Sequence, residues 1–198
     1  QGITANNSGN GGSVLNGTIT GATWSNSGKF GKTLNFNGTS DNIILGSYAG
    51  LTGLTDMTVS AWVNLDTQDS ESTIISQYDH APQYSYSYFI NASGSPHVFL
   101  NSNCNGTGET QATANGTIPT GSWYQVVYVL RGGTDIKFYI NGKLDTTSTN
   151  VPSSLASCTS QVRIGDKQQG QGDDGNLDGL IDEVKIYNYA LTSDEVKL

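Results

Sequence analysis

The tyrosines of the stretch QYDHAPQYSYSYF have a spacing that could serve ligand binding. Tyr84, Tyr86 and Tyr88 occupy every second position, so an extended strand places all three on one face, and Tyr78 lies shortly before them. Aromatic faces beside amides and carboxylates can stack on sugar rings, which makes all four candidate ligand-binding residues. Tyrosines at this spacing also stabilise a half-exposed sheet by cross-strand packing, and the pattern favours neither interpretation.

A second group with possible chemistry is the acidic loop DKQQGQGDDGNLDG. Its carboxylates offer the hard oxygen ligands that calcium prefers, so Asp173, Asp174 and Asp178, with Asp166 nearby, form a candidate ion site. The spacing does not follow the EF-hand pattern. A solvated acidic loop is therefore the favoured interpretation.

The two cysteines, Cys104 and Cys158, each lie in a polar stretch rich in Ser, Thr and Asn. A free thiol there would be exposed to oxidation, so we predict a disulfide and, with it, an oxidising extracellular compartment. The alternative is a pair of free thiols, because the sequence does not give the distance between them.

Composition narrows the class of partner. The formal net charge of -8 and the absence of a Lys/Arg cluster argue against nucleic acid. No apolar run is long enough to span a bilayer. The sequence does not open with a basic segment followed by an apolar one, so we interpret the chain as mature or trimmed. The length of 198 residues suits one domain, residues 1–198, because all-β sandwiches reach this size without dividing.

Short apolar or alternating segments separated by Gly, Asn, Asp and Pro turns predict about ten to thirteen strands in two antiparallel sheets. In MTVSAWVNL, Val59, Ala61 and Val63 share one face, whereas Trp62 shares the other with polar residues. Asn141-Gly142 predicts a tight hairpin turn. At the end of the chain, Thr192 and Glu195 have capping-box spacing and predict a short helix.

Four segments together resemble the laminin-G-like (concanavalin A-like lectin/glucanase) domains of microbial secreted or surface proteins. They are KFGKTLNFNGTSDNIIL, MTVSAWVNL, WYQVVYVLRGGTDIKFYINGKLD and GLIDEVKIYNYALTSDEV, in the order typical of that family. The resemblance implies a two-sheet antiparallel jelly-roll sandwich with a short C-terminal helix. Members of the family have apolar residues at the positions of Trp24 and Trp123, so we interpret these two tryptophans as core or edge anchors.

The resemblance implies a structural calcium ion where the opening turn meets the last strand. By position, its ligands would be Asn10, Asp41 and Asp182, completed by backbone carbonyls of Gly-rich turns. The alternative is that Asp182 accepts backbone hydrogen bonds at a strand end and Asn10 shapes a turn.

The chain departs from the family at its start, because a first strand that often contains Trp is missing before TANNSGNGG. That strand was removed, lies upstream in a longer protein, or is supplied by another chain, since an unfilled sheet edge is a template for strand addition.

Related sandwiches include glycosidases, which need two carboxyl groups about 5 to 5.5 Å apart in retaining enzymes or about 6.5 to 9.5 Å apart in inverting ones. Asp182 and Glu183 are neighbours on opposite faces, and Asp178 and Asp182 would be about 13 Å apart on one strand. Neither pair fits, and the histidines His80 and His97 have no recognisable partners. We therefore predict no catalytic residues and no enzyme activity.

The leading hypothesis is a non-catalytic extracellular module that binds a glycan or cell-surface polysaccharide, with a structural calcium. The alternative is a structural subunit or exposed head of a surface filament, which associates with copies of itself by strand addition. A glycan-cleaving enzyme is the least favoured reading.

Overall fold

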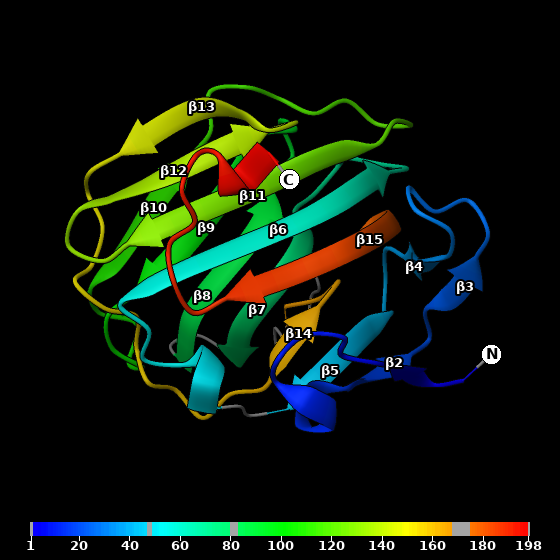
Figure 1. The fold of residues 1–198 in the computed structure, drawn as a ribbon, viewed down its shortest axis with the longest axis horizontal. Coiled ribbons are helices and arrows are strands. Elements are labelled where there is room, and N and C mark those ends of the chain that lie inside the picture. Colours follow the sequence, from blue (N-terminus) through cyan, green and yellow to red (C-terminus); the bar gives the residue numbers. More distant parts are fainter. Residues whose placement is uncertain (1, 47–48, 80–82, 168–174, 198) are drawn as a thin grey trace.

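Two antiparallel sheets pack face to face in the molecule (Figure 1). The structure is a computed structural model, and it describes residues 2–46, 49–79, 83–167 and 175–197. The eight-stranded sheet has the order β1 (Thr4–Ala5), β2 (Gly17–Thr20), β5 (Asn42–Gly46), β14 (Val162–Ile164), β7 (Ser72–Asp79), β8 (Gln83–Ile90), β9 (Pro96–Asn101), β10 (Glu109–Thr113). The seven-stranded sheet has the order β13 (Lys143–Ser148), β12 (Asp135–Ile140), β11 (Tyr124–Arg131), β6 (Asp56–Leu65), β15 (Asp178–Tyr187), β4 (Thr33–Asn37), β3 (Thr23–Ser25). Three 3₁₀ turns, η1 (Gly12–Leu15), η2 (Ala49–Leu51) and η3 (Glu195–Lys197), complete the described elements.

The predicted all-β sandwich is confirmed, and the described residues hold more strands than expected. Among the strands that the sequence did not indicate, β1 has two residues, β3 has three and β2 has four. Segments of this length carry no readable alternation of apolar and polar residues, so their pairing partners define them.

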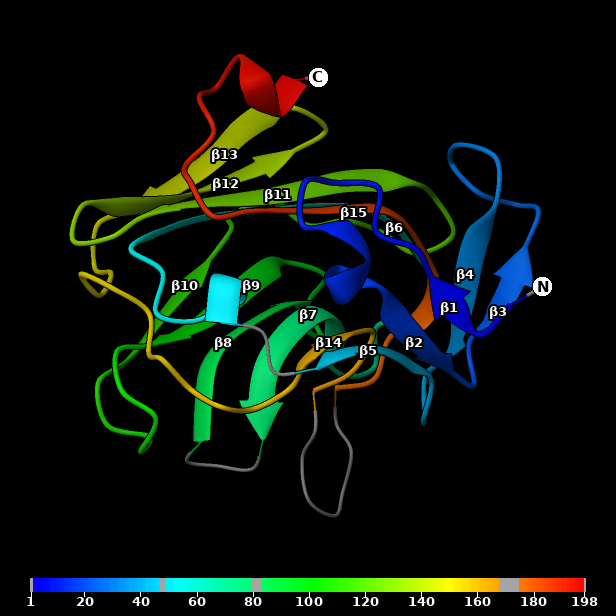
Figure 2. The same ribbon diagram turned by 60° about the horizontal axis from the view of Figure 1, so that its bottom comes forward.

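Strand β6 shows how the sequence pattern builds the core. Val59, Ala61 and Val63 are completely buried between the sheets, because they face the opposite sheet and β11 and β15 flank β6 on both sides. Trp62 points to the outer face, as its place among polar residues predicted. Figure 2 shows the two layers edge-on, with β6, β11 and β15 in one and β7, β8 and β9 in the other.

The hairpin between β12 and β13 turns at Asn141-Gly142, as predicted. Both residues adopt the left-handed region, with φ of 49° at Asn141 and 72° at Gly142. These are the angles of the turn type that matches the right-handed twist of paired strands.

The predicted C-terminal helix is wrong in extent, because only the 3₁₀ turn η3 forms. Its capping box is present: the Glu195 carboxylate accepts the Thr192 amide, and the Thr192 hydroxyl accepts the Glu195 amide. A segment this short gains too few hydrogen bonds to offset helix nucleation. Its Val196 instead packs over the outer face of β11 and β12, against Val127, Val129 and Tyr139.

Candidate functional site

Two of the four tyrosines predicted to bind a ligand lie in the core. Tyr86 and Tyr88 have no exposed surface, and the Tyr88 ring lies 4.6 Å from the ring of Tyr128 in the opposite sheet. Rings without exposed surface cannot stack on a sugar, so the ligand-binding prediction is wrong for these two. Their shared face is the inner face of β8, which the alternation alone could not distinguish from the outer one.

Tyr84 and Tyr78 form a separate pair at the end of β7 and β8. Their rings stack with centroids 4.7 Å apart, and the Tyr84 hydroxyl donates to Glu109. Tyr84 is only 4% exposed, whereas Tyr78 is half-buried. The pair therefore packs mainly within the protein, and Tyr78 keeps some surface.

The three residues of the expected calcium site have different surroundings. Asn10 is exposed in the loop before η1. Asp41 accepts the Asn37 amide at 3.0 Å, and Asn37 pairs with Asp178 across β4 and β15. Asp182 lies four residues after Asp178 along β15, about 13 Å from Asp178 at the usual strand rise. Ion ligands must lie about 2.3–2.6 Å from calcium, so Asp41 and Asp182 do not share one ion.

Asp41 has a structural environment of its own. Burial raises the pKa of its carboxyl group, and the hydrogen bond from Asn37 opposes that effect. A Cβ at Gly21 would lie 1.9 Å from Asp41 Oδ1, so this carboxylate packs directly against the backbone after β2.

The candidate second ion site is described only in part. Asp173 and Asp174 lie outside the described residues. Asp178 begins β15, and its Oδ2 accepts the hydroxyl of Thr67 at 3.0 Å.

Asp182 fixes a loop over the outer face of the seven-stranded sheet. Its Oδ2 accepts the Phe30 amide at 2.9 Å, and its Oδ1 accepts the Glu183 amide at 2.9 Å. Glu183 has φ of 50° at a bulge in β15, which turns the backbone here. A Cβ at Gly28 would lie 2.8 Å from Gly31 O and 3.1 Å from Asp182 Oδ2, so a glycine is needed for this close approach.

The anchored loop covers Trp62. The Phe30 ring meets the Trp62 ring edge-on at 6.0 Å, and Lys29 Nζ lies 4.2 Å from the centroid of the Trp62 ring. A cation over an electron-rich ring face is attracted to it. Lys29 therefore shields one face of the indole, and Trp62 is half-buried with Lys29 in place.

Trp62 belongs to a row of side chains that crosses three strands and the hairpin turn after β12, which we call the outer row: Asn141, Gln125, Trp62 and Asp182. Gln125 pairs with Trp62, and Asp182 pairs with Trp62 from the other side. The Asn141 side chain accepts the Gln125 amide at 2.9 Å, and the Asn141 amide donates to Gln125 O at 2.9 Å. The row thus presents two amides, an indole and a carboxylate in sequence.

The outer row borders a groove of about 620 Å³, a volume within the range of small-ligand sites. Its lining residues are Lys29, Trp62, Trp123, Gln125, Asn141, Gly142, Lys143 and Lys197. Indole faces beside amides and ammonium groups can stack on a sugar ring and hydrogen-bond its hydroxyls.

Sequence reasoning missed this groove, because its residues come from the loop before β4, three strands, a hairpin and η3. The available signal was Trp62 on a polar strand face, since an outward Trp is not needed for the core. Trp123, expected to be an anchor, is half-buried and lines the groove.

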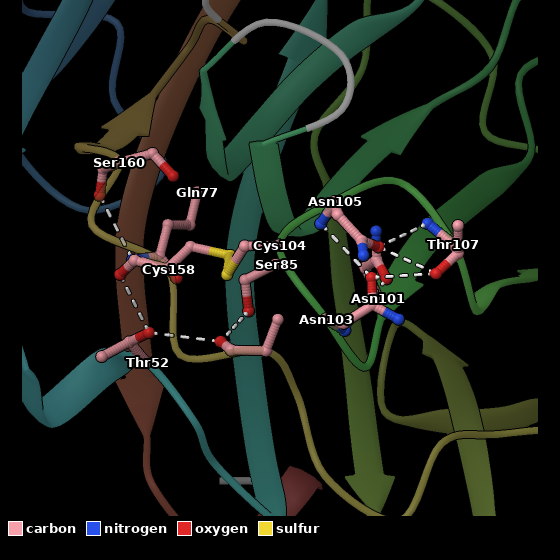
Figure 3. Close-up of a disulfide and its surroundings, with 11 residues drawn as sticks. Thr52, Gln77, Ser85, Asn101, Asn103, Cys104, Asn105, Thr107, Cys158 and Ser160 are labelled. Atoms are coloured by element: carbon pink, nitrogen blue, oxygen red, sulfur yellow. Dashed lines mark hydrogen bonds between the residues drawn. A yellow bond between two sulfur atoms is a disulfide. The ribbon is translucent and has the colours of Figure 1, made fainter.

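The predicted disulfide between Cys104 and Cys158 is confirmed, and it lies beside the eight-stranded sheet (Figure 3). It joins the loop after β9 to a segment that crosses the outer face of β7 and β8. The carbonyl of Ala156 accepts the hydroxyl of Ser85 at 2.8 Å, and Gln77 Nε2 donates to Cys158 O at 3.2 Å. The disulfide and these bonds fix that segment to the sheet.

The two-sheet antiparallel sandwich is the fold of concanavalin A-like domains. The chain belongs to the laminin-G family described as the concanavalin A-like lectin/glucanases superfamily, which matches residues 37–197. No curated protein sequence matches it significantly.

Solved structures of binding domains resemble the chain over most of its length. Domain 4 of AbnA, a GH43 extracellular arabinanase from Geobacillus stearothermophilus, solved in complex with arabinotriose, superposes with a TM-score of 0.71 at 26% identity, covering 91% of this chain and 86% of that one. The binding domain of Paraclostridial Mosquitocidal Protein 1 gives 0.70 at 18% identity, covering 90% of this chain and 45% of that one. A SAP-like pentraxin from Limulus polyphemus gives 0.63 at 21% identity, covering 83% and 79%.

In the described part of the chain, no helix has the length and apolar character needed to cross a membrane.

Proposed function

We propose that the protein is a non-catalytic extracellular carbohydrate-binding module whose glycan lies in the groove beside the outer row. The observation that carries the proposal is the half-buried indole of Trp62 flanked by Gln125 and Asn141 on a fixed sheet face. The likeness to an arabinanase domain solved with arabinotriose supports a saccharide ligand. The disulfide supports an extracellular setting, because disulfides persist in oxidising compartments.

Binding to a panel of soluble polysaccharides, measured by affinity electrophoresis and calorimetry, tests the proposal. Trp62→Ala should weaken binding at least about tenfold, the loss expected when a buried aromatic contact worth about 1.5–3 kcal/mol is removed. Gln125→Ala should weaken it less, because it removes one hydrogen-bonding group and leaves the strand backbone intact.

Tyr189→Ala is the matched control, since Tyr189 is an exposed aromatic residue outside the groove, with 49% of its surface accessible. It should leave binding unchanged. The proposal fails when the parent protein binds no member of the panel, or when Trp62→Ala and Tyr189→Ala have equal effects.

We also propose a structural calcium ion held by Asp182 with backbone carbonyls of the loop at residues 26–32. The support is chemical: Gly31 O and Asp182 Oδ2 both lie close to the position a Cβ would take at Gly28, so hard oxygen ligands converge there. Bound calcium would fasten the loop that covers Trp62. Asn10 and Asp41 are not part of this narrower site.

Calcium should raise the melting temperature of the parent protein, and a chelator should reverse the rise, because an ion that binds only the folded state stabilises it. Asp182→Asn should abolish the calcium effect, whereas Asp178→Asn should retain it. A calcium response that survives Asp182→Asn would contradict this site.

A further inference from the structure

Cations gather around the groove in a chain that is otherwise acidic. Of nine Lys and Arg residues in the sequence, three line the groove: Lys29, Lys143 and Lys197. No carboxylate is among the described residues that line it. The whole chain carries a formal charge of -8, so this local excess of positive charge is the reverse of the overall balance.

The lysines come from three separate parts of the fold. Lys29 lies in the loop anchored by Asp182, Lys143 begins β13 after the hairpin turn, and Lys197 ends η3. Lys197 is paired with Asp194 at 2.9 Å, but both side chains are largely exposed, so water weakens this pair. Lys143 forms no ion pair within the described residues.

The position of Lys29 distinguishes between neutral and acidic sugars. Its ammonium lies over the Trp62 ring, so a sugar that stacks on that face must displace it. A neutral sugar removes the cation–π contact and returns no charge partner to Lys29. An acidic sugar provides an anion to which the displaced ammonium can pair while the sugar ring takes its place.

The carboxylate of Asp182, the acidic member of the outer row, does not oppose the preference for an acidic sugar from inside the groove. Asp182 is not a lining residue, and each of its oxygens accepts a backbone amide, from Phe30 and Glu183. Its charge is thus partly compensated by the loop it anchors.

We infer that the groove selects an acidic saccharide, carrying carboxylate or sulfate, and that Lys29 and Lys143 determine this selectivity. The inference rests on the proposed glycan-binding function and specifies its ligand class. Lysine ammonium groups act as point charges and do not separate a carboxylate from a sulfate, so the anionic sugar is the shared chemistry.

The test compares each acidic oligosaccharide with its uncharged counterpart, using tryptophan fluorescence and calorimetry. One arm uses trigalacturonate and its methyl ester, and the other uses a galactose oligosaccharide with and without sulfate. At least one acidic form should bind about five to ten times more tightly than its neutral counterpart. In the Lys29→Gln/Lys143→Gln variant that preference should fall to less than about twofold, as expected for two exposed charge pairs.

Lys137→Gln is the matched control, because Lys137 lies on β12 outside the groove lining and should not affect the preference. Added salt should reduce the preference of the parent protein, because it screens exposed charges. Trp62→Phe should remove most of the fluorescence change, which identifies the groove as the binding site.

Three results would overturn the inference. If acidic and neutral forms bind equally and Trp62→Ala removes both, the groove binds glycans without charge selection and the proposed function stands. If the acidic preference persists in the double variant, other residues cause it. If no acidic or neutral saccharide binds, the proposed function fails as well.

Discussion

At the scale of single residues, the buried tyrosines carry polar groups that the core does not satisfy. The hydroxyl of Tyr88 is buried without a hydrogen-bond partner in the described residues, whereas the hydroxyl of Tyr128 lies 3.2 Å from Met57 Sδ. An unpaired buried hydroxyl lowers stability. Tyr88→Phe should therefore leave the free energy of unfolding unchanged or raise it by about 1 kcal/mol in urea denaturation.

Tyr128→Phe serves as the comparison, because it removes a hydroxyl that has a sulfur contact. It should be no more stable than the parent protein. A loss above about 1 kcal/mol for Tyr88→Phe would contradict the assignment of its hydroxyl as unpaired.

The same tyrosines predict alkaline sensitivity. Burial raises the pKa values of Tyr86, Tyr88 and Tyr128, because the phenolate form is disfavoured away from water. Their contribution to stability is complete below the unfolded pKa of about 10 and declines as pH rises above it. Phenolate absorbance should show a step that coincides with the loss of the β-sheet circular dichroism signal.

Replacing all three with Phe should reduce the height of that step. Ionisation of these tyrosines well before the sheet signal changes would show that they are accessible to solvent in the native state.

At the scale of elements, the C-terminal segment is fixed by one buried threonine of β6. The Thr58 hydroxyl donates to Tyr189 O at 2.9 Å and accepts the Leu191 amide at 3.0 Å. Thr58→Val keeps the shape but leaves two backbone groups unpaired. It should lower the free energy of unfolding by about 1–3 kcal/mol and increase amide exchange in residues 190–197.

Ser60 provides the control on the same strand and face. Its hydroxyl makes no hydrogen bond within the described residues, so Ser60→Ala should change stability by less than about 0.5 kcal/mol. Equal effects of the two substitutions would indicate that side-chain packing, and not the hydrogen bonds, fixes the segment.

The long strands and the hairpin were predictable because their information is local. The alternation of Val59, Ala61 and Val63 and the Asn141-Gly142 turn each specify structure within a few residues. For the C-terminal turn, the prediction of the cap was confirmed and the predicted extent of the helix was wrong. The packing of this turn on Val127 and Val129 depends on residues distant in sequence.

At the scale of the whole molecule, the disulfide joins residues 54 positions apart in sequence. Cross-linking such a loop restricts the unfolded chain. Cys104→Ala/Cys158→Ala should therefore lower the free energy of unfolding by about 2–4 kcal/mol. Calorimetric melting with and without reductant checks this.

Reductant should destabilise the parent protein and leave the double variant unchanged. A double variant as stable as the parent would show that the hydrogen bonds of Ala156 and Cys158 suffice to fix the crossing segment.

The sandwich was predictable from sequence, whereas its site was predictable only in fragments. Tyr86 and Tyr88 share a face with Tyr84, but the choice between inner and outer face depends on the opposite sheet. The outer row assembles from three strands and a hairpin turn, and the order of these strands cannot be read from the chain. Asp182 was identified as important, and its role in anchoring the loop at residues 26–32 became apparent only from its contacts.

Because Lys197 lines the groove, the position of the C-terminus has a practical consequence. An affinity tag or a fused partner attached there emerges next to the opening and competes with the ligand for space. The N-terminus lies near β1 and β3, away from η3 (Figure 2). Immobilising the protein on a sensor by its N-terminus should leave the groove free, whereas capture by its C-terminus should lower the measured binding capacity.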